Sequence, residues 1–302
     1  MSFWSVAALS ALLFAQQAPA AAGAPDAENT IEGITVIAKP APEADAMQAF
    51  VGEITAKSAN RKVARWDRKI CTGVIGFRAD YAQLMVDRVS AIAASVGLQP
   101  GEPGCKANML IIASGESEAM VKKMVDDNPN AFQQYEHGYT RGKEAMGQFL
   151  TTEAPVRWWH VTRTVTNDGQ RYTRGDSVRV RSAGRISDNA RDEFDHVIIV
   201  IDAKRVGVVR FGALADYVAM VGLAQIEPDA DPGSVQTILN LFSDREVGAT
   251  APTGLTDWDT AYLKGLYSTK RDRRTGAAQE RDVARAMGDT LGEKPRDEDK
   301  KD

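Results

Sequence analysis

A helical segment without a polar face, GALADYVAMVGLAQ at residues 212–225, constrains the fold of this chain more than any other stretch. Its apolar residues recur with the period of an α-helix and also fill the rest of the circumference. They are Leu214, Tyr217, Val218, Met220, Val221, Leu223 and Ala224. The apolar run HVIIVIDA, residues 196–203, comes shortly before and is typical of a strand covered on both faces. The two segments predict a layered fold with a buried central helix.

The other elements predict an α+β fold with a mixed sheet and C-terminal helices. Residues 63–77 and 108–114 have strand character, and residues 80–96 between them carry one apolar stripe that ends at a glycine and a proline. Strand, helix and strand in this order form a βαβ unit. Further helices are expected at residues 116–127, 141–150, 234–242 and 257–267.

A long strand is predicted at residues 156–166, VRWWHVTRTVT, with two mixed faces. Because successive side chains of a strand point to opposite faces, we expect Trp158 or Trp159 to be exposed. An arginine-rich hairpin follows, with Arg171, Arg174, Arg179, Arg181 and Arg185. A solvated edge strand protected by its charges explains this pattern. A site for acidic glycans or phosphates is the alternative.

The first 22 residues predict a signal peptide. The apolar run at residues 3–15 is too short to span a bilayer, and Ala18-Pro19-Ala20 and Ala20-Ala21-Ala22 are small-residue patterns of the kind that signal peptidase cuts after. An uncleaved N-terminal anchor is the alternative. No later stretch has the length and apolarity of a transmembrane span, so we expect an exported protein, periplasmic or secreted.

The mature chain is expected to divide into three parts. Residues 23–50 are an Ala/Pro-rich linker, residues 51–269 a single domain, and residues 270–302 a charged, partly helical mobile tail. Within the linker, IEGITVIAKP resembles the short box by which some outer-membrane transporters engage their energising partner. A plain linker or an edge strand is the other interpretation of that segment.

The cysteines and the net charge allow two further predictions. Cys71 and Cys105 are the two cysteines, and an even number in an exported chain favours a disulfide, although two free buried thiols remain the alternative. The formal net charge is −4, which provides no general attraction to nucleic acid, so no nucleic-acid partner is expected.

The segment around Gly222 resembles the HExxHxxGxxH motif of metzincin-type zinc peptidases with its metal ligands replaced. Ala215 and Ala219 stand at the first two histidine positions, Asp216 at the glutamate position and Gln225 at the third histidine position. Downstream, LTDWDTAYLKGLY at residues 255–267 is similar to the helix that closes many such catalytic domains. The resemblance implies a zincin-like fold in which zinc is not bound, because alanine cannot ligate a metal.

No other catalytic pattern replaces the missing one. The three histidines, His137, His160 and His196, lack HxH or HxxxH spacing, and GxSxG, phosphate-loop and GxGxxG motifs are absent from the sequence. We therefore expect no cofactor and no metal.

Three functions are compatible with the sequence. The first is a non-catalytic, zincin-like pseudoenzyme that binds a peptide, a glycan or a component of the cell envelope, with Trp158, Trp159 and the arginine-rich hairpin as candidate binding residues. The strand at 156–166 would accept an extended segment along its edge. The second is a hydrolase of envelope peptides with a non-standard site. The third is an accessory to an outer-membrane transporter.

Overall fold

A computed structural model describes residues 29–31, 34–36, 44–56, 62–132, 140–166, 169–170, 190–243 and 251–292. The chain divides into two units, Met1–Pro40 and Ala41–Asp302. In the first unit, β1 (Asn29–Ile31) and β2 (Ile34–Val36) pair antiparallel. The second unit carries the described helices and a four-stranded sheet.

The sheet has the order β3-β4-β6-β5, with β3 at Thr72–Ile75, β4 at Met109–Ser114, β6 at Ala190–Asp202 and β5 at Val156–Thr166. The first three strands are parallel, while β5 pairs antiparallel with β6 at the edge of the sheet. The mixed sheet and the helices around it make an α+β fold, as the sequence predicts. The β3–α2–β4 part is the expected βαβ unit, with α2 at Ala79–Ser95.

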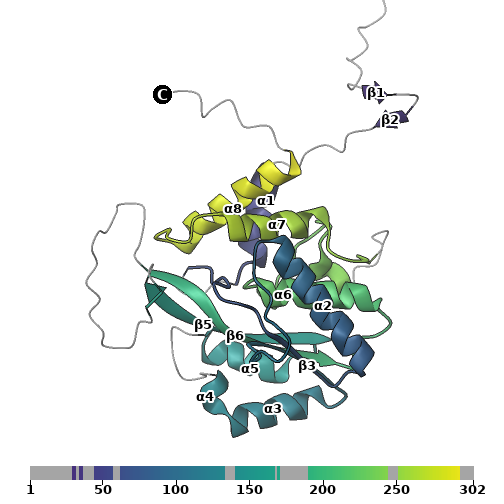
Figure 1. The fold of residues 1–302 in the computed structure, drawn as a ribbon, viewed down its shortest axis with the longest axis vertical. Helices are drawn as coiled ribbons and strands as arrows, with labels where there is room; N and C mark the ends of the chain where they lie inside the picture. Colours follow the sequence, from purple (N-terminus) through teal and green to yellow (C-terminus); the bar gives the residue numbers. More distant parts are fainter. Residues whose placement is uncertain are drawn as a thin grey trace, which may run out of the picture. The chain divides into compact units, whose positions relative to one another are not determined.

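Helices cover both faces of the sheet (Figure 1). One face carries α3 (Ser117–Asp127), α4 (Pro129–Phe132) and α5 (Lys143–Thr151), whose apolar side chains pack with Trp159 and Val161 of β5. The other face carries α2 and α6 (Phe211–Leu223), and behind them lie α1 (Ala44–Ile54), α7 (Asp257–Ser268) and α8 (Gly276–Leu291). The larger core therefore lies on the α6 side of the sheet.

Helix α6 is the buried central helix that its sequence predicts. Every residue from Ala213 to Leu223 is buried. A Cβ on Gly222 would lie 2.9 Å from the Met109 side chain and 3.1 Å from that of Ile199, so the glycine allows α6 to approach the sheet closely. Trp66 packs at the C-terminal end of α6, where its indole N–H donates to the carbonyl of Gly222 at 2.8 Å.

Several boundaries differ from those expected from the sequence. The strand expected at 63–77 is confined to β3, since residues 62–71 run irregularly and insert Trp66 against α6. The helix expected at 234–242 is a single 3-10 turn, η1 (Ile238–Phe242), whose first N–H is held by the Asp259 carboxylate at 2.7 Å.

The ends of the domain also differ. Helix α1 begins at Ala44, within the stretch expected to be a linker, and α8 lies within the stretch expected to be a mobile tail. Helix α8 buries Val283, Ala284 and Met287 against the rest of the core, so the high charge of this stretch lies on its outer face.

The disulfide between Cys71 and Cys105 is present, with a Cα–Cα distance of 5.9 Å. It ties the residue before β3 to the loop before β4. No helix within the described ranges combines the length and apolarity needed to cross a membrane.

Candidate functional site

The positions of the degenerate peptidase motif lie in packing interfaces. Ala215, Ala219 and Gly222 fall on one side of α6, the side that contacts the sheet through Gly222. Both alanines are at most 1% exposed. Both alanines belong to the large core, so their small apolar side chains are part of its packing.

Asp216, at the motif's glutamate position, is a buried carboxylate that forms an ion pair with the half-exposed Arg88. Its carboxylate accepts hydrogen bonds from Nε of Arg88 on α2 and from Nη2 of the same side chain at 2.8 Å. It also accepts the backbone N–H of Leu255 at 2.7 Å. This hydrogen bonding raises the pKa of Arg88. Asp216 is thus fully engaged in connecting α2, α6 and the loop before α7.

Gln225, at the third ligand position, accepts hydrogen bonds from the backbone of residues before β3. Its Oε1 accepts the N–H of Ala64 at 2.9 Å, and its carbonyl accepts the N–H of Ala56 at 2.8 Å. None of the motif positions lines either of the cavities described below. The structure therefore gives all of them a packing or bridging role.

Trp158 and Trp159 lie on opposite faces of β5, as expected, but both are buried, so the expected exposure of one of them is wrong. Helices α4 and α5 cover Trp159, whose indole N–H donates to the carbonyl of Phe132 at 2.9 Å. The indole N–H of Trp158 donates to the carbonyl of Ile226 at 3.1 Å. The candidate residues Arg171, Arg174, Arg179 and Arg181 lie outside the described residues.

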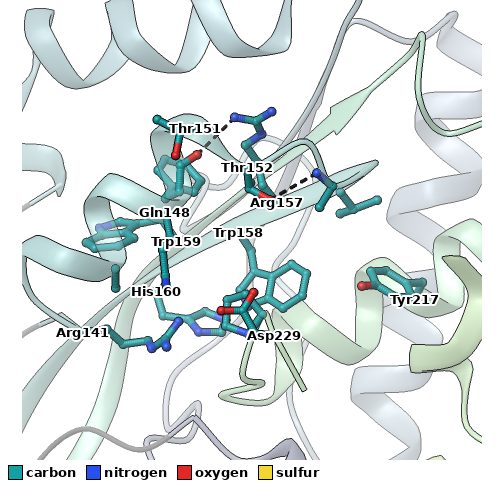
Figure 2. A pocket seen from close by; sticks show the side chains of 15 residues that line it. Arg141, Gln148, Thr151, Thr152, Arg157, Trp158, Trp159, His160, Tyr217 and Asp229 are labelled. Carbon is teal, nitrogen blue, oxygen red and sulfur yellow. Dashed lines mark hydrogen bonds between the residues drawn. The ribbon is translucent and has the colours of Figure 1, made fainter. Parts of the chain in front are cut away.

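A cavity of about 280 Å³ lies where β5 begins, between α5, β5 and the loop at residues 228–229 (Figure 2). Both tryptophans line it, because the cavity wraps around the edge of the strand. The other lining residues that matter here are Phe149, Arg157, His160, Tyr217 and Asp229. Aromatic side chains thus form one part of the wall, and polar and charged side chains form much of the rest.

A second cavity of about 420 Å³ shares part of this wall. Ala154, Val156, Trp158, Tyr217 and Pro228 line both cavities. Toward the second cavity the lining continues with Pro232, Leu239 and Phe242. The two cavities therefore adjoin at the start of β5, and together they are called the groove below.

The main chain of β5 presents hydrogen-bonding groups to this groove. The N–H of Asp202 donates to the carbonyl of Pro155 at 2.8 Å, which places Pro155 in a hydrogen-bonded pair with β6. Hydrogen-bonded and non-hydrogen-bonded pairs alternate along an antiparallel ladder, so Val156 and Trp158 direct their N–H and C=O groups away from β6. Within the described ranges no strand pairs with this outer edge.

Arg157 brings a positive charge into the site. The residue is only 4% exposed, and its Nη1 donates to the carbonyls of Phe149 and Leu150, at the end of α5, at 3.2 and 3.3 Å. Its Nε has no hydrogen-bond partner among the described residues. Burial lowers the pKa of Arg157, while the more distant charges of Asp202 and Glu118 act in the opposite direction.

Two further polar groups line the aromatic wall. Burial lowers the pKa of His160 to about 4, so its imidazole is neutral at physiological pH, and its Nε2–H donates to the carbonyl of Val221 at 2.8 Å. Burial also raises the pKa of Tyr217, whose hydroxyl forms no hydrogen bond with any described residue. Tyr217 thus keeps its proton and its capacity to bond to a ligand.

At the opposite end of the cavity, positive and negative side chains lie together. Arg141 forms an ion pair with Glu227, and the exposed carboxylate of Asp229 lies nearby (Figure 2). No three His, Cys, Asp or Glu side chains in the described part of the chain are grouped closely enough to hold a metal.

The sequence identifies part of this site. It places Arg157 and both tryptophans on a candidate edge strand, but Tyr217 and Asp229 come from segments whose proximity no local pattern reveals. An arginine inside an otherwise strand-like run is the one signal that the sequence offers for Arg157. No protein-family model matches the chain, and no curated protein or solved structure does either.

Proposed function

We propose that the protein is a non-catalytic binding protein that takes an extended peptide along the outer edge of β5. The observation that carries this proposal is the outward-facing main chain of Val156 and Trp158 at an aromatic-lined groove. Val156 and Trp158 are 2% and 6% exposed, so a peptide strand reaches their outward-facing N–H and C=O groups through the two cavities, which its alternate side chains enter.

An exported location belongs to the same proposal. The disulfide between Cys71 and Cys105 supports it, because such bonds persist in oxidising compartments. Export with cleavage after Ala20 or Ala22 predicts a mature chain that begins at Ala21 or Gly23, and mass spectrometry of the protein from the producing cells checks this. The zincin-like ancestry implied by the motif remains a prediction, and the proposed binding site does not depend on it.

Main-chain methylation provides the sharpest test of strand addition. The probe is the pentapeptide Ac-Thr-Val-Thr-Val-Phe-OH, titrated by isothermal calorimetry together with variants that carry one N-methyl group each. Because alternate residues of an added strand bond to the edge, we expect methylation at every second position to weaken binding about tenfold or more, and methylation between them to have little effect. Equal effects at all positions would contradict strand addition.

Substitution of the protein completes the test. Trp158→Ala removes the aromatic wall that both cavities share, so we expect it to abolish measurable binding. Leu84→Ala, at a position on α2 that is 55% exposed and lines neither cavity, is the matched control and is expected to bind as the unaltered protein does.

A further inference from the structure

Arg157 is a buried cation without a counter-ion. Its guanidinium bonds to main-chain carbonyls alone, and no carboxylate of the described residues forms an ion pair with it. A buried charge is costly unless it is paired, and neutral carbonyls compensate only part of the lost hydration. Other arginines near the sheet are paired, such as Arg88 with Asp216 and Arg163 with Glu193. Arg157 therefore lacks a directly bonded anion, and the charges of Asp202 and Glu118 act on it only from a distance.

Arg65 is the informative comparison. It is 2% exposed and also lacks an ion pair in the described structure, but it donates to the carbonyl and the hydroxyl of Thr269 and to the carbonyl of Lys270. The space beside it measures about 10 Å³, which is room for no more than one water molecule. Arg157 instead lines a cavity of about 280 Å³, so a ligand group has room to reach it.

The position of Arg157 along the groove identifies the part of the ligand that meets it. Its guanidinium lies at the end of the cavity formed by Thr151 and Thr152, away from Arg141 and Asp229 (Figure 2). Thr151 and Thr152, where α5 ends and the connection to β5 begins, line this end of the first cavity. We infer that a strand running along the edge of β5 ends here and presents the end of its chain to Arg157.

We propose that Arg157 binds the C-terminal carboxylate of the peptide, and that the last side chain lies against Trp158 and Tyr217. A guanidinium binds a carboxylate through charge-assisted hydrogen bonds. Nη1 of Arg157 bonds to the α5 carbonyls and Nε is buried, so Nη2, which bonds to no described residue, is the donor that remains for a ligand. The aromatic wall favours a bulky apolar or aromatic last residue. This inference rests on the proposed function, and it adds the class of ligand: free C-terminal ends of extended peptides.

The test compares a free acid with its amide. Ac-Thr-Val-Thr-Val-Phe-OH and Ac-Thr-Val-Thr-Val-Phe-NH₂ differ only in the terminal charge. We expect the acid to bind about tenfold or more tightly to the unaltered protein, with the difference shrinking at high salt. In Arg157→Gln, which keeps an N–H donor for the α5 carbonyls, we expect acid and amide to bind equally. Circular dichroism and thermal unfolding establish that the variant is folded.

Each outcome has a separate meaning. Equal, measurable binding of acid and amide by the unaltered protein overturns the carboxylate inference and leaves strand addition standing. Binding of neither peptide contradicts the proposed function itself. N-acetylphenylalanine has the same carboxylate and ring as the pentapeptide but no strand. Its affinity therefore distinguishes a site for peptide C-termini from a site for small aromatic acids. If it binds as tightly as the pentapeptide acid, the site takes small aromatic acids and the peptide assignment is wrong.

Discussion

At the scale of single residues, burial determines the chemistry of the groove. His160 is enclosed by Phe194 and the Val221 carbonyl, and Arg141 is the nearest charge that acts on it. Its imidazole is therefore a fixed hydrogen-bond donor in the native state. The rings of Trp158 and Tyr217 pack edge to face with their centroids 6.2 Å apart and form the aromatic part of the wall.

His160 predicts a fall of stability in mild acid. Its pKa is about 4 in the folded protein against 6.5 in the unfolded chain, so between these values only the unfolded chain binds the proton. The free energy of unfolding should thus decrease as the pH falls from about 6.5 to about 4, by on the order of 2–3 kcal/mol from this group.

Urea unfolding across this pH range measures the effect. His160→Gln keeps a donor for the Val221 carbonyl but does not titrate, so its stability should change less between pH 6.5 and 4 than that of the unaltered protein. Glu227 has its pKa raised by burial and contributes in both proteins, so it cancels from the difference. Parallel curves for the two proteins would show that the His160 imidazole is protonated without cost.

At the scale of elements, one buried carboxylate holds three segments together. Asp216 on α6 bonds to Arg88 on α2 and to the N–H of Leu255, and a Cβ on Gly254 would lie 2.8 Å from its Oδ2. The Asp216 side chain is 2% exposed while that of Arg88 is 49% exposed. The guanidinium of Arg88 thus lies near the surface, while the carboxylate of Asp216 lies inside the protein.

Removing Arg88 should cost more than a surface ion pair contributes. Arg88→Ala leaves the Asp216 carboxylate buried with a single remaining donor, and we expect a loss of about 2–4 kcal/mol of unfolding free energy. Lys123→Ala, which breaks the exposed Lys123–Asp127 pair on α3, is the matched control and should change stability little. Similar losses in the two variants would mean that Arg88 acts only as a surface charge.

The elements that the sequence predicts well are those whose signal is local. The stripe of α2, the enclosed helix α6 and the full extent of β5 follow from periodicity within a single segment. Helix α8 was expected to be mobile because its charges obscure a stripe of Gln279, Val283 and Met287, four residues apart. The cavity could not be predicted, since it joins α5, the edge of β5 and Tyr217 of α6.

At the scale of the whole domain, its two ends close the core together. Helices α1 and α8 pack on each other and on α7, at the side of α6 away from the sheet (Figure 1). The side-chain carbonyl of Gln279 accepts the N–H of Val63 at 2.8 Å, which ties α8 to the segment that leads into β3. Helix α8 is therefore a structural part of the domain.

Deleting α8 should prevent cooperative folding. A chain that ends after Thr269 exposes the surface that Val283, Ala284 and Met287 cover, and each such side chain contributes about 1.5–3 kcal/mol except the smaller alanine. The two larger side chains together contribute about 3–6 kcal/mol, which is comparable with the lower end of the stability of an ordinary domain, about 5–15 kcal/mol. A chain that ends after Gly292 keeps α8 and should unfold at the same temperature as the full chain. Met287→Ala, fully buried, should lose about 2–5 kcal/mol and still fold, which calorimetry can resolve. A shortened chain ending at Thr269 with an unchanged unfolding temperature would show instead that α8 only rests on a core that is complete without it.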